Sequence, residues 1–352
     1  MGPLRRRLLT LGLAVLALAG CARPQGQAEI LRYASPYSPN HPFSRADLEW
    51  MRFVERASQG RLKVQPFWGG SLISSDQSVI ELRHGVADVA LITPIYMRAG
   101  MKAMKTQAGF YGGVRTIEDQ VSVYRCLEDR FPIFGQELAG VHVLAIQGGN
   151  LPNVLTRDRP IRRLEDLRGL RLRAPTELVP VLQKLGVDVV TMPMGEVYSA
   201  ISKGVDDGVV APADTIKSMH FNEVAAHLTL LHVPRGAYPA RAISETRWRQ
   251  LPPDLQGVLT RSTAVWEAAL AREIGKAEGD GAAFGRKNGV EFIALDPAEQ
   301  LRFDGIYNAT ALEHARDLNR YGIDGPAIFR QAQSVLSQGS PVGACGPAGP
   351  RG

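Results

Sequence analysis

The sequence predicts an α/β protein, because short apolar runs of strand length alternate with segments of helical spacing. The clearest example lies between residues 164 and 216. Residues 170–173 alternate leucine with arginine, as in a half-buried strand, and the segment 178–185 carries leucine and valine at helical spacing. The apolar run 187–192 predicts another strand, and 195–203 predicts another helix. This alternation is typical of a parallel sheet covered by helices.

The amino-terminal part repeats the pattern. Ser44, followed three residues later by Asp47, predicts a capping box that starts a helix ending near Gly60. A second helix is expected to start at Ser75 or Asp76 and to end at Gly85. The strands expected around these helices are 30–34, 62–67 and 87–93. This half of the chain is therefore also expected to be β/α.

Weaker signals cover the rest of the chain. Residues 99–140 are expected to be mostly helical, and 141–146 to form a strand. Gly148-Gly149 directly follows that strand and is expected to act as a hinge between two lobes. From Pro252 to about Leu336 the chain is expected to be largely helical. A length of 352 residues is enough for two lobes that each have a core.

The first residues have the composition of an export signal. Arg5, Arg6 and Arg7 precede an apolar run, 8–19, which is too short to span a bilayer and ends at Leu18-Ala19-Gly20-Cys21. This ending predicts a lipoprotein signal peptide over 1–21, with Cys21 lipidated and 22–28 as a polar tether. We expect a protein in the periplasm, or lipid-anchored at the outer face of the cytoplasmic membrane. The alternative is an ordinary export signal with an incidental cysteine.

Charge and cysteine content exclude some classes of protein. Residues 1–21 hold three arginines and no acid, so their removal would lower the formal net charge from +6 to +3. A mixed charge of this size does not indicate binding to nucleic acid. After Cys21 only Cys126 and Cys345 remain, and a bridge between them would have to hold the Gly/Pro-rich segment 337–352, which we expect to be disordered. We therefore expect both cysteines to be unpaired.

Catalytic motifs are absent from the sequence. It contains no HExxH, GxSxG, GxxxxGK[ST] or GxGxxG pattern, and its histidines show no spacing typical of metal ligands. We therefore expect no enzyme, no metal site and no ATP or redox cofactor. His41 is the one histidine expected near a pocket, and Glu196 is expected to favour the dipole at the start of its helix.

Arg173 is the main candidate for ligand binding. It ends the strand 170–173, and open α/β sheets bind ligands at the carboxyl ends of their strands. A guanidinium is always charged, and its fork of donors matches a carboxylate. The sequence therefore predicts a carboxylate clamp at Arg173. The structural alternative is an ordinary ion pair with Glu177 or Asp188.

The order and spacing of several short motifs resemble the solute-binding proteins of TRAP transporters, the tripartite ATP-independent periplasmic importers of organic acids. The resemblance covers nearly the whole chain after the leader. The motifs are Asp166-Leu167-x-Gly169-Leu170-x-Leu172-Arg173-x-Pro175, Leu185-Gly186, Met192-Pro193, Glu196-Val197-Tyr198, Gly204-Val205-x-Asp207-Gly208, Ala34-x-x-Tyr37-x-x-Asn40-His41-Pro42, Gly70-x-Leu72, Glu81-x-x-x-Gly85 and Trp248-x-x-Leu251-Pro252.

This resemblance implies a two-lobed fold of the periplasmic-binding-protein type, in which each lobe is a β-sheet flanked by helices. It implies a long helix over 253–287 that bridges the lobes. Lobe I would comprise 29–149 and about 237–276, and lobe II 150–236 and about 277–336. A small organic acid would be captured by closure about crossings near residues 149 and 236 and passed to a membrane permease driven by an ion gradient.

The resemblance also assigns residues to the pocket. The family's arginine at position 173 makes a bidentate contact with the substrate carboxylate. A second family arginine corresponds here to Asn153, a glutamate and an asparagine correspond to Val210 and Ala211, and Met194 replaces an aromatic residue. We therefore expect a less polar pocket, in which these side chains accept an apolar or aromatic part of the ligand.

Further residues are candidates for contact with the ligand. Asp214 lies just beyond the family motif and is a candidate contact for a hydroxyl, an amine or a cation, with a solvated helix cap as the alternative. From the other lobe, Tyr37, Trp68 and Asp76 are candidates because they follow predicted strands.

Two other functions remain open at this point. One is an enzyme on the same fold, which would need His41 or Glu196 beside a reactive hydroxyl. The other is a sensory module that uses lobe closure to bind a receptor.

Overall fold

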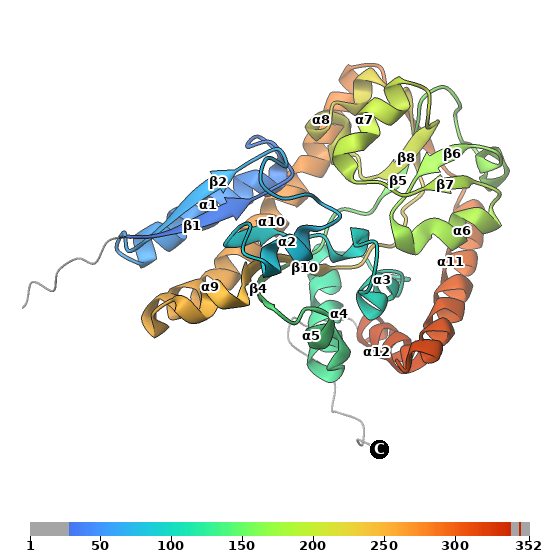
Figure 1. Cartoon of the computed structure of the whole chain (residues 1–352). Coiled ribbons are helices and arrows are strands. Elements are labelled where there is room, and N and C mark those ends of the chain that lie inside the picture. Colours follow the sequence, from blue (N-terminus) through green and yellow to red (C-terminus); the bar gives the residue numbers. More distant parts are fainter. Residues whose placement is uncertain (1–27, 339–344, 346–352) are drawn as a thin grey trace, which may run out of the picture.

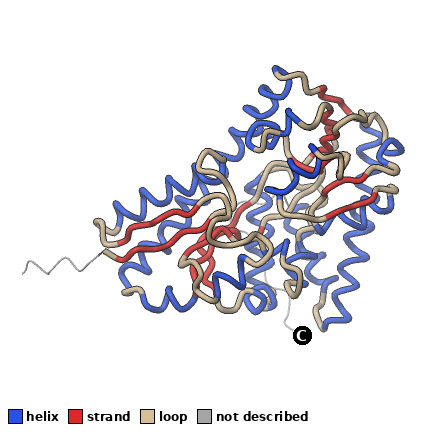
Figure 2. Tube along the Cα trace, turned by 45° about the horizontal axis from the view of Figure 1, so that its top comes forward, coloured by secondary structure: helices blue, strands red, loops and turns tan. Residues whose placement is uncertain are grey.

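The computed structural model describes residues 28–338 and residue 345, and contains two β-sheets with helices around them (Figures 1 and 2). The strand order is β2-β1-β3-β10-β4 in the first sheet and β11-β9-β5-β8-β6-β7 in the second. The predicted α/β class is confirmed. The predicted signal peptide, Cys21, the tether up to residue 27 and nearly all of the predicted disordered tail lie outside the described residues.

The strands divide between the two sheets. Those of the first sheet are β1 (Glu29–Ala34), β2 (Leu62–Phe67), β3 (Val89–Leu91), β4 (Val141–Gln147) and β10 (Tyr238–Ser244). Those of the second sheet are β5 (Asn153–Thr156), β6 (Arg171–Arg173), β7 (Asp188–Val190), β8 (Gly208–Ala211), β9 (His227–Leu230) and β11 (Glu291–Ala294).

Helices surround both sheets. They are α1 (Pro42–Ala57), α2 (Ser78–Arg83), α3 (Lys102–Gln107), α4 (Ile117–Arg130), α5 (Ile133–Glu137), α6 (Val179–Lys184), α7 (Met194–Ser202), α8 (Asp214–Ser218), α9 (Glu245–Gln250), α10 (Pro253–Lys287), α11 (Pro297–Asp317) and α12 (Gly325–Ser337). None of the helices in the described part of the chain has the length and apolarity needed to cross a bilayer.

Both sheets are mixed, which the sequence did not predict. β6 pairs in parallel with β7 and with β8, as the alternation over 164–216 indicated. However, β5 runs antiparallel to β8 and β9, and β10 runs antiparallel to β3 and β4. β10 showed no alternation because all seven of its residues are buried, including Arg241.

The predicted start of the first long helix is wrong. α1 begins at Pro42, two residues before Ser44, and the Nδ1 atom of His41 caps it by accepting a hydrogen bond from the Phe43 amide at 3.2 Å. Proline is well suited to the first helical position because its fixed φ matches the helix. Ser44 and Asp47 therefore lie inside the helix, on its buried face.

Asp47 is the centre of a buried polar cluster. Its carboxylate accepts hydrogen bonds from the Tyr33 hydroxyl at 2.6 Å, Arg241 Nε at 2.8 Å and Trp266 Nε1 at 2.8 Å. All four side chains have no measurable exposure. The charge of Arg241 is thus compensated in the core, and α1 is tied to β1, β10 and α10 at one point.

The long helix expected over 253–287 is present as α10 (Figure 1). It packs on α1 beside the first sheet and on α8 beside the second. The contact with α8 is close, since a Cβ atom at Gly281 would lie 2.4 Å from the Ala213 carbonyl oxygen. α10 therefore connects the two lobes.

The last two helices also connect the lobes. α11 packs on α6, which covers the second sheet, whereas α12 packs on α4 beside the first. Residues 277–336 are expected in lobe II, whereas α12, which lies in this range, packs on α4 beside the first sheet. The lobe boundaries themselves stay a prediction.

The expectation that both cysteines are unpaired is wrong. Cys126 on α4 and Cys345 form a disulfide bond, across a sequence separation of 219 residues. α12 packs on α4, the helix that carries Cys126. Such a contact between distant segments has no local signature in the sequence.

We predict that Asp47→Asn lowers the free energy of unfolding by about 3–5 kcal/mol, because it leaves Arg241 buried without a counter-charge. Chemical denaturation would measure this change. Glu49 lies on α1 like Asp47, and Glu49→Gln removes an exposed ion pair with Arg272 of α10. This substitution should change the free energy of unfolding by at most about 1 kcal/mol. Equal effects of the two substitutions would contradict the role assigned to Asp47.

We also predict that reduction of the disulfide lowers the free energy of unfolding by about 2–4 kcal/mol, since the bond constrains the unfolded chain. Denaturation with and without reductant would show the difference. Cys345→Ser should reproduce the reduced state and be insensitive to reductant. A wild-type protein with two free thiols at these positions would refute the pairing.

Candidate functional site

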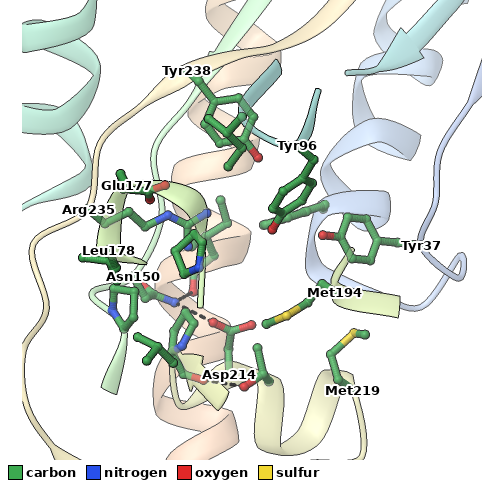
Figure 3. Close-up of a pocket in the computed structure, with 18 of the residues that line it drawn as sticks. Tyr37, Tyr96, Asn150, Glu177, Leu178, Met194, Asp214, Met219, Arg235 and Tyr238 are labelled. Carbon is green, nitrogen blue, oxygen red and sulfur yellow. Dashed lines mark hydrogen bonds between the residues drawn. The ribbon is translucent and has the colours of Figure 1, made fainter. Parts of the chain in front are cut away.

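A cavity lies between the two sheets, with about 830 Å³ of space free of atoms when its mouth is included (Figure 3). Its wall is mostly aromatic, aliphatic, proline and methionine. The lining residues are Tyr37, His41, Phe43, Ile95, Tyr96, Asn150, Pro152, Pro175, Glu177, Leu178, Met194, Val210, Pro212, Asp214, Thr215, Met219, Pro234, Arg235, Tyr238 and Ile274.

The carboxyl ends of parallel strands supply much of this wall. Tyr37 and His41 follow β1, Tyr96 follows β3, and Glu177 follows β6. Asp214 follows β8 and begins α8. The position of the cavity thus agrees with the rule that open α/β sheets bind ligands beyond the carboxyl ends of their strands.

Arg173 lies at the end of β6 and is only 2% exposed. Its Nε and Nη2 atoms donate to the Met192 carbonyl at 3.0 and 2.9 Å, and Nη2 also donates to the Tyr96 hydroxyl at 2.7 Å. Within the part of the chain that the structure describes, no carboxylate pairs with it. The expected alternative of an ion pair with Glu177 or Asp188 is therefore wrong, and Asp188 pairs instead with Arg171 at 3.1 Å.

The Arg173–Tyr96 contact joins the two lobes. Tyr96 belongs to a short turn after β3 of the first sheet, whereas Arg173 ends a strand of the second. Tyr96 lines the cavity directly, and Arg173 lies behind it. The guanidinium of one lobe therefore contacts the aromatic wall of the other.

The structure brings several other predicted residues together. Tyr37, Met194, Val210 and Asp214 line the cavity. Asn153 and Ala211 are paired neighbours on β5 and β8, are nearly fully buried and do not reach the wall. The Asn153 side-chain oxygen is buried without a hydrogen-bond partner.

Trp68 and Asp76 lie away from the cavity. Trp68 packs edge-on against Tyr33 with ring centroids 5.8 Å apart, and Asp76 pairs with Arg98 at 2.9 Å. Both follow β2, which is the edge strand of the first sheet. A position after a strand was therefore not sufficient to place them at the site. The strand must also lie in the interior of the sheet, close to the cavity, and β2 lies at the edge.

Sequence reasoning missed several lining residues, namely Tyr96, Asn150, Glu177, Arg235 and Tyr238. Asn150 follows the expected hinge, and Arg235 precedes the expected crossing near residue 236. Polar residues at the crossings were the signal that could have identified these two. Tyr96 had no comparable signal, because its turn follows a strand of only three residues.

Two backbone segments cross between the sheets, 148–152 after β4 and 231–237 after β9. Gln120 holds the first crossing, since its side-chain amide exchanges hydrogen bonds of 2.7 and 2.8 Å with Gly149. The Val233 amide donates to the Pro152 carbonyl at 2.9 Å, so the crossings contact each other. The hinge at Gly148-Gly149 stays a prediction.

Acidic groups of the second lobe gather at one side of the cavity. Asp214 accepts hydrogen bonds from Asn150 at 3.3 Å and Ser218 at 3.4 Å, and Glu278 of α10 accepts from the amides of Ala213 and Asp214. Burial raises the pKa of Asp214 and of Glu177. Burial, and then the negative charge of Asp214, raises the pKa of Glu278 to about 7.

His41 is a structural residue at the edge of the cavity. Its ring stacks on Tyr37 with centroids 4.1 Å apart, and its Nδ1 lone pair caps α1. Burial, and then the positive charges of Arg45 and Arg241, lower its pKa to about 3. Glu196 is exposed in the first turn of α7. The geometry required for an enzyme that uses His41 or Glu196 is therefore not observed in the described residues.

Residues 33–314 match the family described as bacterial extracellular solute-binding protein, family 7. A solute-binding protein of Albidiferax ferrireducens is 26% identical over 268 residues, which cover 73% of this chain and 77% of the relative. The C4-dicarboxylate-binding periplasmic protein DctP of Rhodobacter capsulatus is 21% identical over 338 residues, covering 94% and 99% of the two chains.

Solved structures share the fold. A TRAP solute-binding protein from Rhodoferax ferrireducens, in complex with copurified benzoate, superimposes with a TM-score of 0.80 at 21% identity over 88% of this chain and 98% of that one. One from Bordetella bronchiseptica with bound mandelate gives 0.78 at 20% identity, covering 88% and 99%. The fold is therefore that of a two-lobed binding protein.

We predict that Glu278→Gln flattens the pH dependence of stability. Because the pKa of Glu278 is about 7 in the folded protein, above the ordinary value of 4.5, the folded state binds this proton more tightly. The stabilisation by protonated Glu278 is fully present below pH 4.5 and is lost as the pH rises to about 7. Denaturation of wild type and variant across pH 4 to 8 would reveal the difference. Parallel curves would contradict the assignment.

Proposed function

The chain belongs to the bacterial extracellular solute-binding proteins of family 7, and from this membership we propose that it captures a small organic acid in the cavity between its lobes. Its family relatives are binding proteins of TRAP transporters and not enzymes. The function is therefore transport, in which the binding protein delivers its solute to a membrane permease. We propose lipid anchoring through Cys21 on the basis of the sequence alone.

The main support for an acidic ligand is the buried charge of Arg173. A fully buried cation is costly unless an anion compensates it, and Arg173 has only neutral oxygen partners among the described residues. Its Nη1 atom makes no hydrogen bond there. A ligand carboxylate that reaches the guanidinium would supply the missing charge, and the low-polarity surroundings would strengthen the attraction.

The rest of the wall suits an apolar or aromatic part of the ligand. Figure 3 shows Met194 and Met219 of the second lobe on the side of the cavity toward Tyr37 and Tyr96 of the first, and Val210 also lines the cavity. Burial of an aromatic ring among such side chains is favourable by about 25 cal/mol per Å² of apolar surface. Relatives of the same fold hold benzoate and mandelate, which have a carboxylate and one ring. Asn153 and Ala211 would support this wall from behind, and Asp214 would accept a hydrogen bond from a ligand hydroxyl.

Capture would proceed by lobe closure about the two crossings. The open cleft admits the acid, and closure brings Tyr96 of one lobe onto Arg173 of the other. Ligand bound between the two lobes adds contacts that only the closed form has, so it shifts the population toward that form. The permease would then receive a closed, loaded binding protein.

The proposal is tested by thermal unfolding of the purified protein with benzoate, mandelate, succinate and galactonate, and with neutral amides of the same acids. A ligand that binds only the folded state raises the midpoint, so at least one acid should do so and its amide should not. We expect Arg173→Ala to weaken binding of that acid by about 10-fold to 100-fold, as for loss of a hydrogen bond to a charged group.

Arg171→Ala is the matched control, because Arg171 lies on the same strand with its side chain exposed to solvent. It should leave the affinity for the acid unchanged. If no acid raises the midpoint while an uncharged compound does, the carboxylate assignment is refuted. If both arginine variants bind the acid as wild type does, Arg173 is not the clamp.

A further inference from the structure

Arg235 has no counterpart in the site predicted from the sequence. It lies on the second crossing, between β9 and β10, and its side chain lines the cavity. Figure 3 shows it between Glu177 and Asp214. Unlike Arg173, which is shielded behind Tyr96, Arg235 is only partly buried and faces the space that a ligand would occupy.

Arg235 is also unpartnered. Across residues 28–338 and 345 its side chain makes neither a hydrogen bond nor an ion pair, although a guanidinium carries five N–H donors. Three acids are close enough to sense its charge, namely Glu177, Asp214 and Glu278, yet none approaches within ion-pair distance. The N–H donors of Arg235 are therefore free to bond to an acceptor from outside the chain.

The neighbouring backbone leaves room for this guanidinium. Gly149 lies on the first crossing, and a Cβ atom there would be 2.5 Å from both Cζ and Nη1 of Arg235. Any side chain at position 149 would therefore displace the guanidinium. Gln120 fixes Gly149 through both of its backbone polar groups, so the space is held open by hydrogen bonds.

From this arrangement we infer that Arg235 is a second ligand-binding arginine, which contacts the acidic group of the solute directly and depends on the absence of a side chain at Gly149. The inference rests on the proposed function, because it assigns a further residue to the same site. It identifies the cationic group that a carboxylate meets on entering the cavity. Arg173 then adds its positive charge from behind Tyr96.

The nearby acids do not act as fixed counter-ions of Arg235. Burial raises the pKa of all three, and one Glu177 carboxylate oxygen is buried without any hydrogen bond. Protonation of Glu278, whose pKa is about 7, removes one of these negative charges below pH 7 and leaves more of the charge of Arg235 to the ligand. An acidic solute can therefore bind beside acidic side chains, and its binding should be tighter at pH 6 than at pH 8.

The test uses the full chain with three pairs of probes, benzoate and benzamide, mandelate and mandelamide, and succinate and succinamide, in titration calorimetry. Arg235→Met keeps the length of the side chain and removes its charge, Arg235→Lys keeps the charge and removes the fork, and Gly149→Ala keeps Arg235 but displaces it. Arg45→Met is the control, since Arg45 lines a neighbouring pocket and is already paired with Glu273 at 2.7 Å.

We expect Arg235→Met to weaken binding of the acid by about 10-fold or more, with smaller losses for Arg235→Lys and Gly149→Ala. Binding of the amide should change less than about twofold, and Arg45→Met should bind like wild type. A variant Arg235→Met that binds the acid as wild type does, or that loses acid and amide equally, overturns the inference. A wild-type protein that binds none of the three acids instead overturns the proposed function, and this inference with it.

Discussion

The carboxylate of Asp47 is the contact on which the rest of the structure depends. It lies on α1 and accepts hydrogen bonds from β1, β10 and α10 inside a core of stacked tryptophans. Both β10 and α10 continue toward the second lobe. Their attachment to α1 at one buried point therefore determines where the second crossing leaves the first sheet, and with it where Arg235 and Tyr238 reach the cavity.

The two kinds of arginine in this protein illustrate one physical rule. Arg241 is buried beside Asp47, so its charge is compensated within the chain and it serves the fold. Arg173 and Arg235 have no carboxylate partner among the described residues, and both are beside the cavity. In our proposal, the lack of an internal counter-ion distinguishes these two guanidinium groups, which would bind ligand, from Arg241, which stabilises the core.

Local patterns predicted a large part of the fold. β1, β2 and β6 lie within one residue of the expected strands, because each has a regular apolar pattern and a clear boundary. Segments with no pattern of their own were missed, such as β10, β5 and the turn at Tyr96. The start of α1 was misplaced because Ser44 and Asp47 imitate a capping box, although the tertiary structure uses both inside the helix.

The sequence by itself determined the alternation of strands and helices, the long helix α10, the family and the position of Arg173 at a strand end, because these follow from residues close together in the chain. Only the tertiary structure decided which loops meet at the cavity, that Cys126 bonds to Cys345, and that Arg235 stands beside Gly149. Asp47 and Arg241 are 194 residues apart, and the two cysteines 219. Contacts over such separations depend on how whole lobes pack, which no local pattern of residues encodes.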